Sequence, residues 1–292
     1  MTFIRCFVPG GGQLGRMLAA SASLLNIKVV VLDVGENGPA KQVVYPSAPH
    51  LSHIDGSFMN PEKIRELAAK VDILTVEIEH VDVNTLQEVE ASSSQNHLVI
   101  HPSPVTIKII QDKLKQKQHL LSHGSPVSKF LQVNSTVESI HSAAQRLGLP
   151  LMLKSRTLAY DGRGNFVVRD LSQAKEAISA LGNRPLYAEK WVPFVKEIAV
   201  MVVRTTDAQV KSYPAVETVH KDNICHLVFA PLRGTDANLC NRAQAVAEAA
   251  VTTLGGAGVF GVELFLLENG MVVPVWPTTQ ETDLMRRGFV RE

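Results

Sequence analysis

The sequence predicts an α/β fold divided into three units. The chain has 292 residues, which is longer than the size at which a single hydrophobic core usually stops growing. About the first hundred residues alternate short apolar runs with amphipathic ones, a pattern typical of a parallel sheet with helices on its faces. The rest of the chain mixes strand-like and helical segments less regularly, which indicates two further α+β units.

In the first unit, apolar runs of strand length separate segments of helical periodicity. Asn60 before Pro61 is a strong helix start, because asparagine caps free amides and proline tolerates the first helical position. We expect strands over 3–8, 28–33, 72–79 and 98–100, and helices over 13–27, 61–70 and 84–91.

A polar, helical segment runs from Pro102 to His123 and ends at Gly124-Ser125-Pro126. We predict that it is a linker helix between the first unit and the second. The predicted divisions are an N-terminal domain over 1–103, the linker helix over 104–125, a lid-like domain over 126–192 and a C-terminal domain over 193–292.

The second and third units each combine strands and helices. In the second we expect helices over 135–148 and 171–182 and strands over 150–155, 165–170 and 185–192. In the third we expect strands over 197–204, 210–217, 224–230, 258–268 and 270–275 and an alanine-rich helix over 237–255. After Pro277 the apolar periodicity stops, so we expect an irregular, poorly packed tail.

The composition favours a soluble cytosolic protein that acts on small molecules. The 29 basic and 28 acidic side chains nearly cancel, and no long run of one sign suggests a nucleic-acid partner. No apolar stretch is long enough to cross a membrane, and the apolar run at the N-terminus is too short for a signal peptide. Cys6, Cys225 and Cys240 are far apart and lack metal-ligand spacing, which suits core thiols in a reducing compartment.

A glycine-rich loop, Pro9-Gly10-Gly11-Gly12-Gln13-Leu14-Gly15-Arg16, joins the first predicted strand to the first helix. Glycines allow close backbone approach, and a helix N-terminus offers amides to an anion. A G-x-G-x-x-G pattern passes through Gly10, Gly12 and Gly15, and Asp33 lies where a ribose-binding carboxylate is expected. The alternative is a simple strand-to-helix turn.

Charged residues also mark the ends of predicted strands. Glu77 and Glu79 fall on one face of a strand end, where open α/β sheets bind ligands, unless they form only a solvated terminus. Lys154 ends a strand in the second unit, and Lys113 lies on the linker helix. Each offers a point charge to phosphate, or is an ordinary surface lysine.

The segment 160–166, YDGRGNF, follows Lys154. Asp161-Gly162 between strand-forming residues is a hairpin signal. The same glycines suit a loop that covers phosphate.

Three further features belong to the crossing between the second and third units or to the third unit itself. Glu189, Lys190, Trp191 and Val192, followed by Glu197, offer backbone groups, an apolar wall and a carboxylate to an adenine and its ribose, although Trp191 equally suits a core. His220 alone reads as a surface histidine. Glu263 interrupts an apolar strand, where a carboxylate is costly unless it is paired or bound to metal.

Taken in order, these motifs resemble the ATP-grasp enzymes, and among them the N5-carboxyaminoimidazole ribonucleotide synthetases of purine biosynthesis. The matching segments extend from about residue 7 to residue 273: GGGQLGRM, TVEIEH, the Lys113 helix, LKSRTLAYDGRGNF, EKWVPFVKE, VHKDN and GVELF. The segment VETVHKDNICHLVFAP most resembles the fungal form, in which this synthetase precedes a second, carboxylase-mutase domain.

The resemblance implies an N-terminal Rossmann-like parallel sheet and two α+β domains that enclose ATP. It implies cofactor-binding roles for Lys113, Lys154, Ala159, Tyr160, Asp161, Gly162, Arg163, Gly164, Asn165, Glu189, Lys190, Trp191, Val192, Glu197 and His220. Among these, Tyr160, Asp161 and Arg163 are also the catalytic candidates. It further implies that Gln13, Leu14 and Glu77 meet the ribonucleotide substrate and that Glu263 binds magnesium. Relatives often carry arginine where this chain has Lys113. The lysine keeps the positive charge but lacks the guanidinium fork.

The implied reaction is ATP-dependent carboxylation. ATP and bicarbonate form carboxyphosphate, whose carboxyl group passes to the amine of 5-aminoimidazole ribonucleotide. The implied cofactors are ATP and magnesium, the implied partners are small-molecule substrates, and the relatives suggest a homodimer.

The sequence departs from the family after residue 273. There the family continues with Asn-Glu, which completes the metal site, and with a segment that holds substrate phosphate; this chain has Pro274-Val275-Trp276-Pro277. Glu281 and Asp283 lie nearby but have no spacing that replaces the lost carboxylate. We therefore expect impaired catalysis, and we expect the change to reflect a frameshift, a splice form or a truncated gene model. The alternatives are an inert nucleotide-binding or dimerisation protein and a sister ligase that uses another acid.

Overall fold

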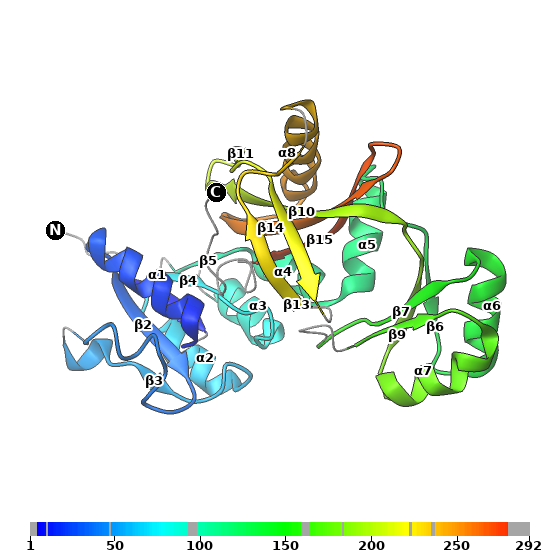
Figure 1. The fold of residues 1–292 in the computed structure, drawn as a ribbon. Coiled ribbons are helices and arrows are strands. Elements are labelled where there is room, and N and C mark those ends of the chain that lie inside the picture. The colour runs from blue at the N-terminus through cyan, green and yellow to red at the C-terminus, as the bar shows by residue number, and fades with distance from the viewer. Residues whose placement is uncertain are drawn as a thin grey trace.

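The computed structural model describes residues 5–9, 11–46, 48–92, 98–158, 164–182, 184–221, 224–234 and 237–279. These residues form three sheets. In Figure 1 the first sheet lies on the left in blue to cyan, the second on the right in green, and the third between and above them in yellow-green to red. The α/β prediction is confirmed.

The first sheet is parallel throughout and has the strand order β3-β2-β1-β4-β5. Side chains of β2 alternate between two cores: Val29 and Val31 pack with α1, whereas Val30 and Leu32 lie in the cluster that includes α2 and α3. Helices therefore cover both faces. The elements are β1 (Arg5–Pro9), α1 (Gln13–Leu24), β2 (Lys28–Asp33), the 3₁₀ helix η1 (Pro49–Leu51), β3 (Ile54–Asp55), α2 (Pro61–Ala68), β4 (Ile73–Thr75), α3 (Val83–Ser92) and β5 (Val99–His101).

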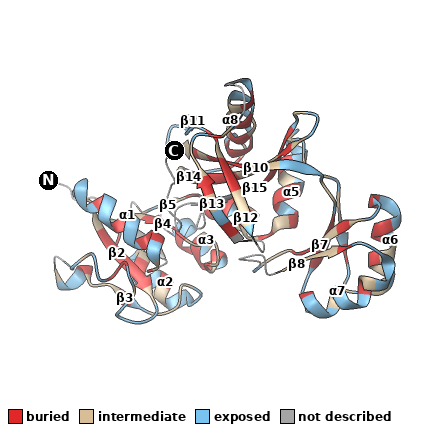
Figure 2. Ribbon diagram, viewed as in Figure 1, coloured by how far each residue is buried: buried red, intermediate tan, exposed pale blue. Residues whose placement is uncertain are grey.

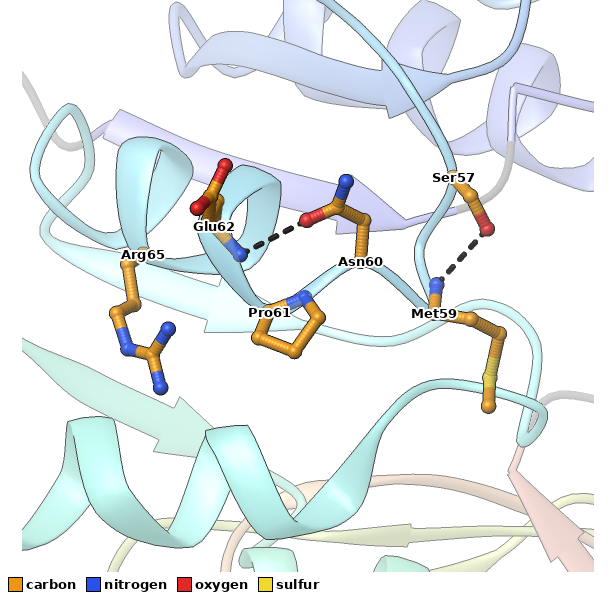
Figure 3. A pocket seen from close by; sticks show the side chains of 6 residues that line it. All are labelled: Ser57, Met59, Asn60, Pro61, Glu62 and Arg65. Atoms are coloured by element: carbon orange, nitrogen blue, oxygen red, sulfur yellow. Dashed lines mark hydrogen bonds between the residues drawn. The ribbon is translucent and has the colours of Figure 1, made fainter.

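The start of α2 is as predicted. The side chain of Asn60 accepts a hydrogen bond from the Glu62 amide at 2.9 Å, and Pro61 occupies the first helical position (Figure 3). The predicted strand over 72–79 was too long, because β4 ends at Thr75. Glu77 and Glu79 follow the strand instead of ending it.

The linker consists of two helices where one was predicted. These are α4 (Pro104–Gln111) and α5 (Lys113–Ser122), and Asp112 between them has extended backbone angles. Its carboxylate accepts hydrogen bonds from the amides of Leu114 and Lys115 at 3.1 and 3.2 Å. Asp112 therefore ends one helix and caps the next.

The second sheet has the order β6-β9-β7-β8 and is antiparallel. Leu151, Leu153 and Ala188 pack against the helices α6 and α7, so both helices cover one face and the opposite face is left for polar residues. Strand β6 was not predicted. The elements are β6 (Phe130–Val133), α6 (Val137–Leu147), β7 (Leu151–Ser155), β8 (Asn165–Val168), the 3₁₀ helix η3 (Leu171–Gln173), α7 (Ala174–Leu181) and β9 (Leu186–Lys190).

The third sheet has the order β13-β12-β10-β14-β15, and β11 pairs with β10. Its buried residues under α8 include Ile198, Val200, Val262 and Leu264, and Figure 2 shows this stripe of burial along β10 and β14. Strand β15 continues past Pro277, so the predicted irregular tail begins later than expected. The elements are β10 (Phe194–Arg204), β11 (Val210–Ser212), β12 (Val216–Lys221), β13 (Ile224–Phe229), α8 (Ala237–Thr252), β14 (Gly258–Leu267) and β15 (Val272–Thr279).

The turn between α8 and β14 ties the third unit to the start of α4. The buried Thr106 hydroxyl donates to the Gly255 carbonyl and accepts from the Gly255 amide, both at 2.8 Å. A Cβ on Gly256 would lie 2.4 Å from the Ser103 nitrogen, so only glycine fits there. Among the residues described, no helix is long and apolar enough to span a membrane.

Candidate functional site

A buried carboxylate, Glu189, lies at the centre of the predicted nucleotide site. It stands near the end of β9, on the polar face of the second sheet, and is 4% exposed. One of its oxygens pairs with Lys117 Nζ at 2.7 Å and accepts from the Ser128 hydroxyl, and the other pairs with Lys154 Nζ at 2.9 Å. The structure thus joins two predicted residues, Glu189 and Lys154.

These contacts keep Glu189 ionised despite its burial. Burial alone raises the pKa of a carboxyl, but attraction to Lys154 and Lys117 outweighs it and lowers the pKa of Glu189 to about 2. Two ammonium groups therefore share one carboxylate.

Lys113 begins α5 and belongs to the same electrostatic cluster. Burial and repulsion from Lys154 lower the pKa of Lys113 to about 8, against the attraction of Glu263, Glu79 and Glu189. Lys113 therefore lies within electrostatic range of residues from all three units, including Lys154, the other lysine predicted to meet phosphate.

The junction of the two linker helices is fastened to the second sheet. Arg156, just after β7, pairs with both carboxylate oxygens of Asp112, at 3.2 Å for Nε. The Lys113 amide donates to the Arg156 carbonyl at 2.8 Å. The backbone that carries Lys113 is thereby fixed to the strand that carries Lys154.

Two residues predicted separately, Glu197 and His220, form a pair on the third sheet. Glu197 lies on β10 opposite Thr218 of β12, and its carboxylate contacts Nδ1 of His220. The pair occupies the face of the third sheet opposite α8. His220, which its own pattern predicted as a surface loop histidine, lies on strand β12.

The segment between β9 and β10 includes Lys190, Trp191 and Val192. The side chain of Lys190 is exposed, whereas Trp191 and Val192 are half-buried. Beyond them, Phe194 stacks on Phe265 of β14, with ring centroids 4.2 Å apart. This segment connects the two sheets and offers backbone groups between them.

Glu263 lies on β14 opposite Ala199 of β10 and is half-buried. On its other side, the β15 residue in register is Trp276, and a register shift follows directly. Within the described ranges, no group of three histidine, cysteine or acidic residues is arranged to hold a metal. In the described part of β15, the position in register with Glu263 is Trp276, which does not fit the two-carboxylate magnesium site that the resemblance implies.

The glycine loop of the first unit has a structural explanation. The Gly11 amide donates to Asp33 Oδ2 at 2.7 Å, and the Val34 amide donates to Asp33 Oδ1 at 2.8 Å. Asp33, which was expected to bind ribose, accepts hydrogen bonds from these two backbone amides instead. Gln13 is exposed at the start of α1, whereas Leu14 is buried, so Leu14 offers a ligand its backbone rather than its side chain.

Glu77 is buried and follows β4, while Glu79 is half-buried beside it. The side-chain amide of Gln111 donates to the carbonyls of Glu79 and Val81 at 2.6 and 2.7 Å. This contact holds the Glu79 loop against α4, next to the start of α5.

The hairpin predicted for the YDGRGNF segment is confirmed by its two flanking strands. Strands β7 and β8 are antiparallel, with Lys154 opposite Asn165, and the Ser155 amide donates to the Gly164 carbonyl at 2.7 Å. Ala159, Tyr160, Asp161, Gly162 and Arg163 lie outside the described residues, as do Gly10, Glu281 and Asp283.

Sequence reasoning missed Lys117, Ser128, Asp112 and Arg156. The available signal was spacing, since Lys117 follows Lys113 by four residues and shares its helix face. Asp112 carries the local pattern of a helix cap but nothing that predicts its contact with Arg156, and Ser128 and Arg156 carry no local pattern that predicts their contacts.

A separate open hollow lies at the start of α2, lined by Ser57, Met59, Asn60, Pro61, Glu62 and Arg65 (Figure 3). In this view Ser57 points toward the Met59 amide, to which it is hydrogen-bonded at 3.1 Å. None of the predicted site residues lines it.

Comparison with known proteins agrees with the fold. Residues 4–111 match the ribonucleotide synthetase preATP-grasp domain, and residues 118–274 match the ATP-grasp domain. A phosphoribosylaminoimidazole carboxylase of Ogataea methanolica is 54% identical over 89% of this chain and 47% of its own length. The chain thus spans about half the length of the curated relative it matches.

Solved structures give the same result. A carboxyaminoimidazole ribonucleotide synthase of Aspergillus clavatus in complex with ATP is 46% identical, with a TM-score of 0.89 over 96% of this chain and 71% of that one. An Aspergillus clavatus N5-carboxyaminoimidazole synthase with ADP and 5-aminoimidazole ribonucleotide is 44% identical, with a TM-score of 0.87 over 95% and 70%. Two joined domain matches and this structural likeness place the chain in the ATP-grasp family, among the N5-carboxyaminoimidazole ribonucleotide synthases.

Proposed function

We propose that this chain binds ATP and 5-aminoimidazole ribonucleotide and catalyses the carboxylation of the latter with bicarbonate. The observation that carries the proposal is the lysine cluster, in which Lys154 and Lys117 share Glu189 and Lys113 lies within electrostatic range. Ammonium groups held at the junction of two sheets suit a polyphosphate. A relative with 46% identity has been solved with ATP.

The sheets offer each part of the nucleotide a different set of groups. Lys154 and Lys113 supply charge for the phosphates, and the backbone from Glu189 to Val192 supplies hydrogen-bonding groups for adenine. The Glu197–His220 pair on the third sheet supplies a carboxylate and an imidazole for the ribose. We assign the phosphate-covering role to the loop from Ala159 to Asn165 and the catalytic role to Tyr160, Asp161 and Arg163, although residues 159–163 lie outside the described part of the chain.

The proposed chemistry has two steps. A bicarbonate oxygen attacks the γ-phosphorus, the bond to the bridging oxygen breaks, and ADP leaves as carboxyphosphate forms. The substrate amine then attacks the carboxyl carbon, inorganic phosphate leaves, and the amine loses a proton. Because water destroys carboxyphosphate, the site has to exclude it during both steps.

The metal site sets an expectation for the rate. On β15, the position in register with Glu263 is Trp276 and not the second carboxylate that the resemblance implies, so we derive no step through magnesium. Losing one preorganised charge-stabilising group costs about a hundredfold to a thousandfold in rate. We therefore propose a carboxylase that turns over slowly compared with its relatives.

The experiment measures ADP release by the purified chain, with and without 5-aminoimidazole ribonucleotide and bicarbonate. A parallel protein carries the family's ending from residue 274 onward. We expect both substrates together to stimulate ADP release in each protein, and more strongly in the second. Equal rates would contradict the slow-turnover proposal, and no stimulation in either protein would contradict the carboxylation itself.

A second candidate is a nucleotide-binding protein on the same fold that does not turn over. The register of β15, which places Trp276 opposite Glu263, favours it. ATP binding by the native chain, with stimulated ADP release only in the protein with the family's ending, would identify this case. For either function we propose action in the cytoplasm as a homodimer, which sedimentation would test.

A further inference from the structure

We propose that Lys117 is a positioning residue for ATP: through Glu189 it sets where the Lys154 ammonium meets the phosphates. The inference rests on the proposed ATP binding but concerns a residue that the resemblance does not assign. Lys117 is 1% exposed, so its side chain does not reach a ligand. Its effect on a nucleotide has to pass through its contacts.

The two oxygens of the Glu189 carboxylate have different partners. Oε1 is held by Lys117 Nζ at 2.7 Å and by the Ser128 hydroxyl, which also accepts from Lys117 Nζ at 2.9 Å. Oε2 is thereby directed to Lys154 Nζ at 2.9 Å. A carboxylate fixed at one oxygen by two donors presents the other oxygen in a single direction.

Charge supports the same arrangement. Without Lys117, the full negative charge of Glu189 would act on Lys154 and hold its ammonium back from an incoming phosphate. With Lys117 present, the charge is shared between two ammonium groups, and Lys154 keeps attraction for an anion.

Geometry adds a second role. Lys113 and Lys117 are four residues apart on α5, so their side chains leave the same face of that helix. Lys117 pairs with Glu189 of β9, while Asp112 and the Lys113 amide bind Arg156, just after β7. These two attachments fix the separation of Lys113 from Lys154, which a polyphosphate has to span.

The test compares Lys117→Met with Lys115→Met, a matched variant on the exposed side of the same helix. Affinities for ATP, ADP and adenosine are measured by calorimetry on the full chain. We expect Lys117→Met to weaken ATP and ADP about tenfold or more while adenosine affinity stays unchanged, because only the phosphate contact is displaced. Lys115→Met should leave all three affinities at the native values.

Because Lys117→Met leaves a buried charge with fewer partners, the double variant Lys117→Met/Glu189→Gln guards against misfolding. It removes both charges, and its thermal unfolding is measured first. If the pair positions Lys154, the double variant folds and no longer carries the charge that holds Lys154 back, yet it still binds ATP more weakly than the native chain, because no carboxylate fixes the ammonium. A role in folding alone would restore ATP binding in the double variant, or would weaken adenosine as much as ATP.

Different results would contradict the proposed ATP binding and the positioning role of Lys117. If the native chain binds no ATP, the proposed function falls, and this inference falls with it. If the native chain binds ATP and Lys117→Met binds it equally well, only the positioning role is overturned.

Discussion

Lys113 carries a charge that changes within an accessible range of pH. Burial and the neighbouring Lys154 lower the pKa of Lys113 to about 8, so the ammonium is charged below that pH and neutral above it. A bound polyphosphate favours the charged form.

We therefore expect ATP affinity to fall as the pH rises, by about tenfold between about pH 7 and 9. Arginine stays protonated over this range, so Lys113→Arg should bind ATP with little dependence on pH. Calorimetric titrations at several pH values check this. An equal fall in both proteins would show that another group is responsible.

His53 provides a test of stability at the same scale. Its Nδ1 accepts from the Val31 amide at 3.1 Å, and its Nε2 donates to the Val44 carbonyl at 2.7 Å, so the folded chain requires the neutral ring. Burial lowers the pKa of His53 below 6.5, although the bond to Val44 opposes the shift.

The folded chain binds a proton at His53 less readily than the unfolded chain does. The stability that the neutral His53 ring contributes is therefore present above the unfolded pKa and is lost as the pH falls below it. We expect the stability advantage of the native chain over His53→Gln to shrink between about pH 7.5 and 5.5. Urea unfolding at both pH values measures it. A constant advantage would contradict the interpretation.

The loop between β1 and α1 is tested at the scale of elements. A Cβ on Gly11 would lie 2.6 Å from Asp33 Oδ2, whereas one on Gly12 would meet no atom within 4 Å. We expect Gly11→Ala to lower the free energy of unfolding by about 1–3 kcal/mol. Gly12→Ala should change it little. Chemical denaturation of both variants gives the comparison, and equal effects would refute the close packing of Asp33 on Gly11.

Local sequence was enough to predict most elements but not where they stop. Asn60-Pro61 identified the start of α2 because the cap and its helix are adjacent in the chain. Asp112 separates the two linker helices. It caps the second helix locally and also contacts Arg156, 44 residues away. Strand β6 is short, and pairing with β9 fixes it, so its own pattern was too weak to predict.

The site shows the same division. Lys154 and Glu263 stood out because they end or interrupt apolar strands, and Glu189 and Glu197 because they lie at the crossing between two units. Lys117 is one of several lysines on a polar helix, and nothing local distinguishes it from the exposed Lys115. Its burial depends on two sheets and a helix meeting, which only the assembled molecule specifies.

The assembly of the whole molecule depends on the contact between α4 and the turn before β14. Thr106 satisfies both the amide and the carbonyl of Gly255. We expect Thr106→Val, which leaves both groups unpaired, to lower the unfolding free energy by about 1–3 kcal/mol. Thr106→Ser retains the hydroxyl and should lose much less. Thermal unfolding checks this, and similar losses in both variants would contradict a dominant contribution of the hydroxyl.

The strand order of the third sheet bears on how the protein behaves at high concentration. Strand β15 is an edge of that sheet, bonded to β14 on one side. It contains Pro274 and Pro277, and proline has no amide hydrogen to offer a passing strand. The residues that replace the expected metal-binding sequence thus also interrupt the row of amide donors through which an exposed strand edge pairs with a second molecule and starts aggregation.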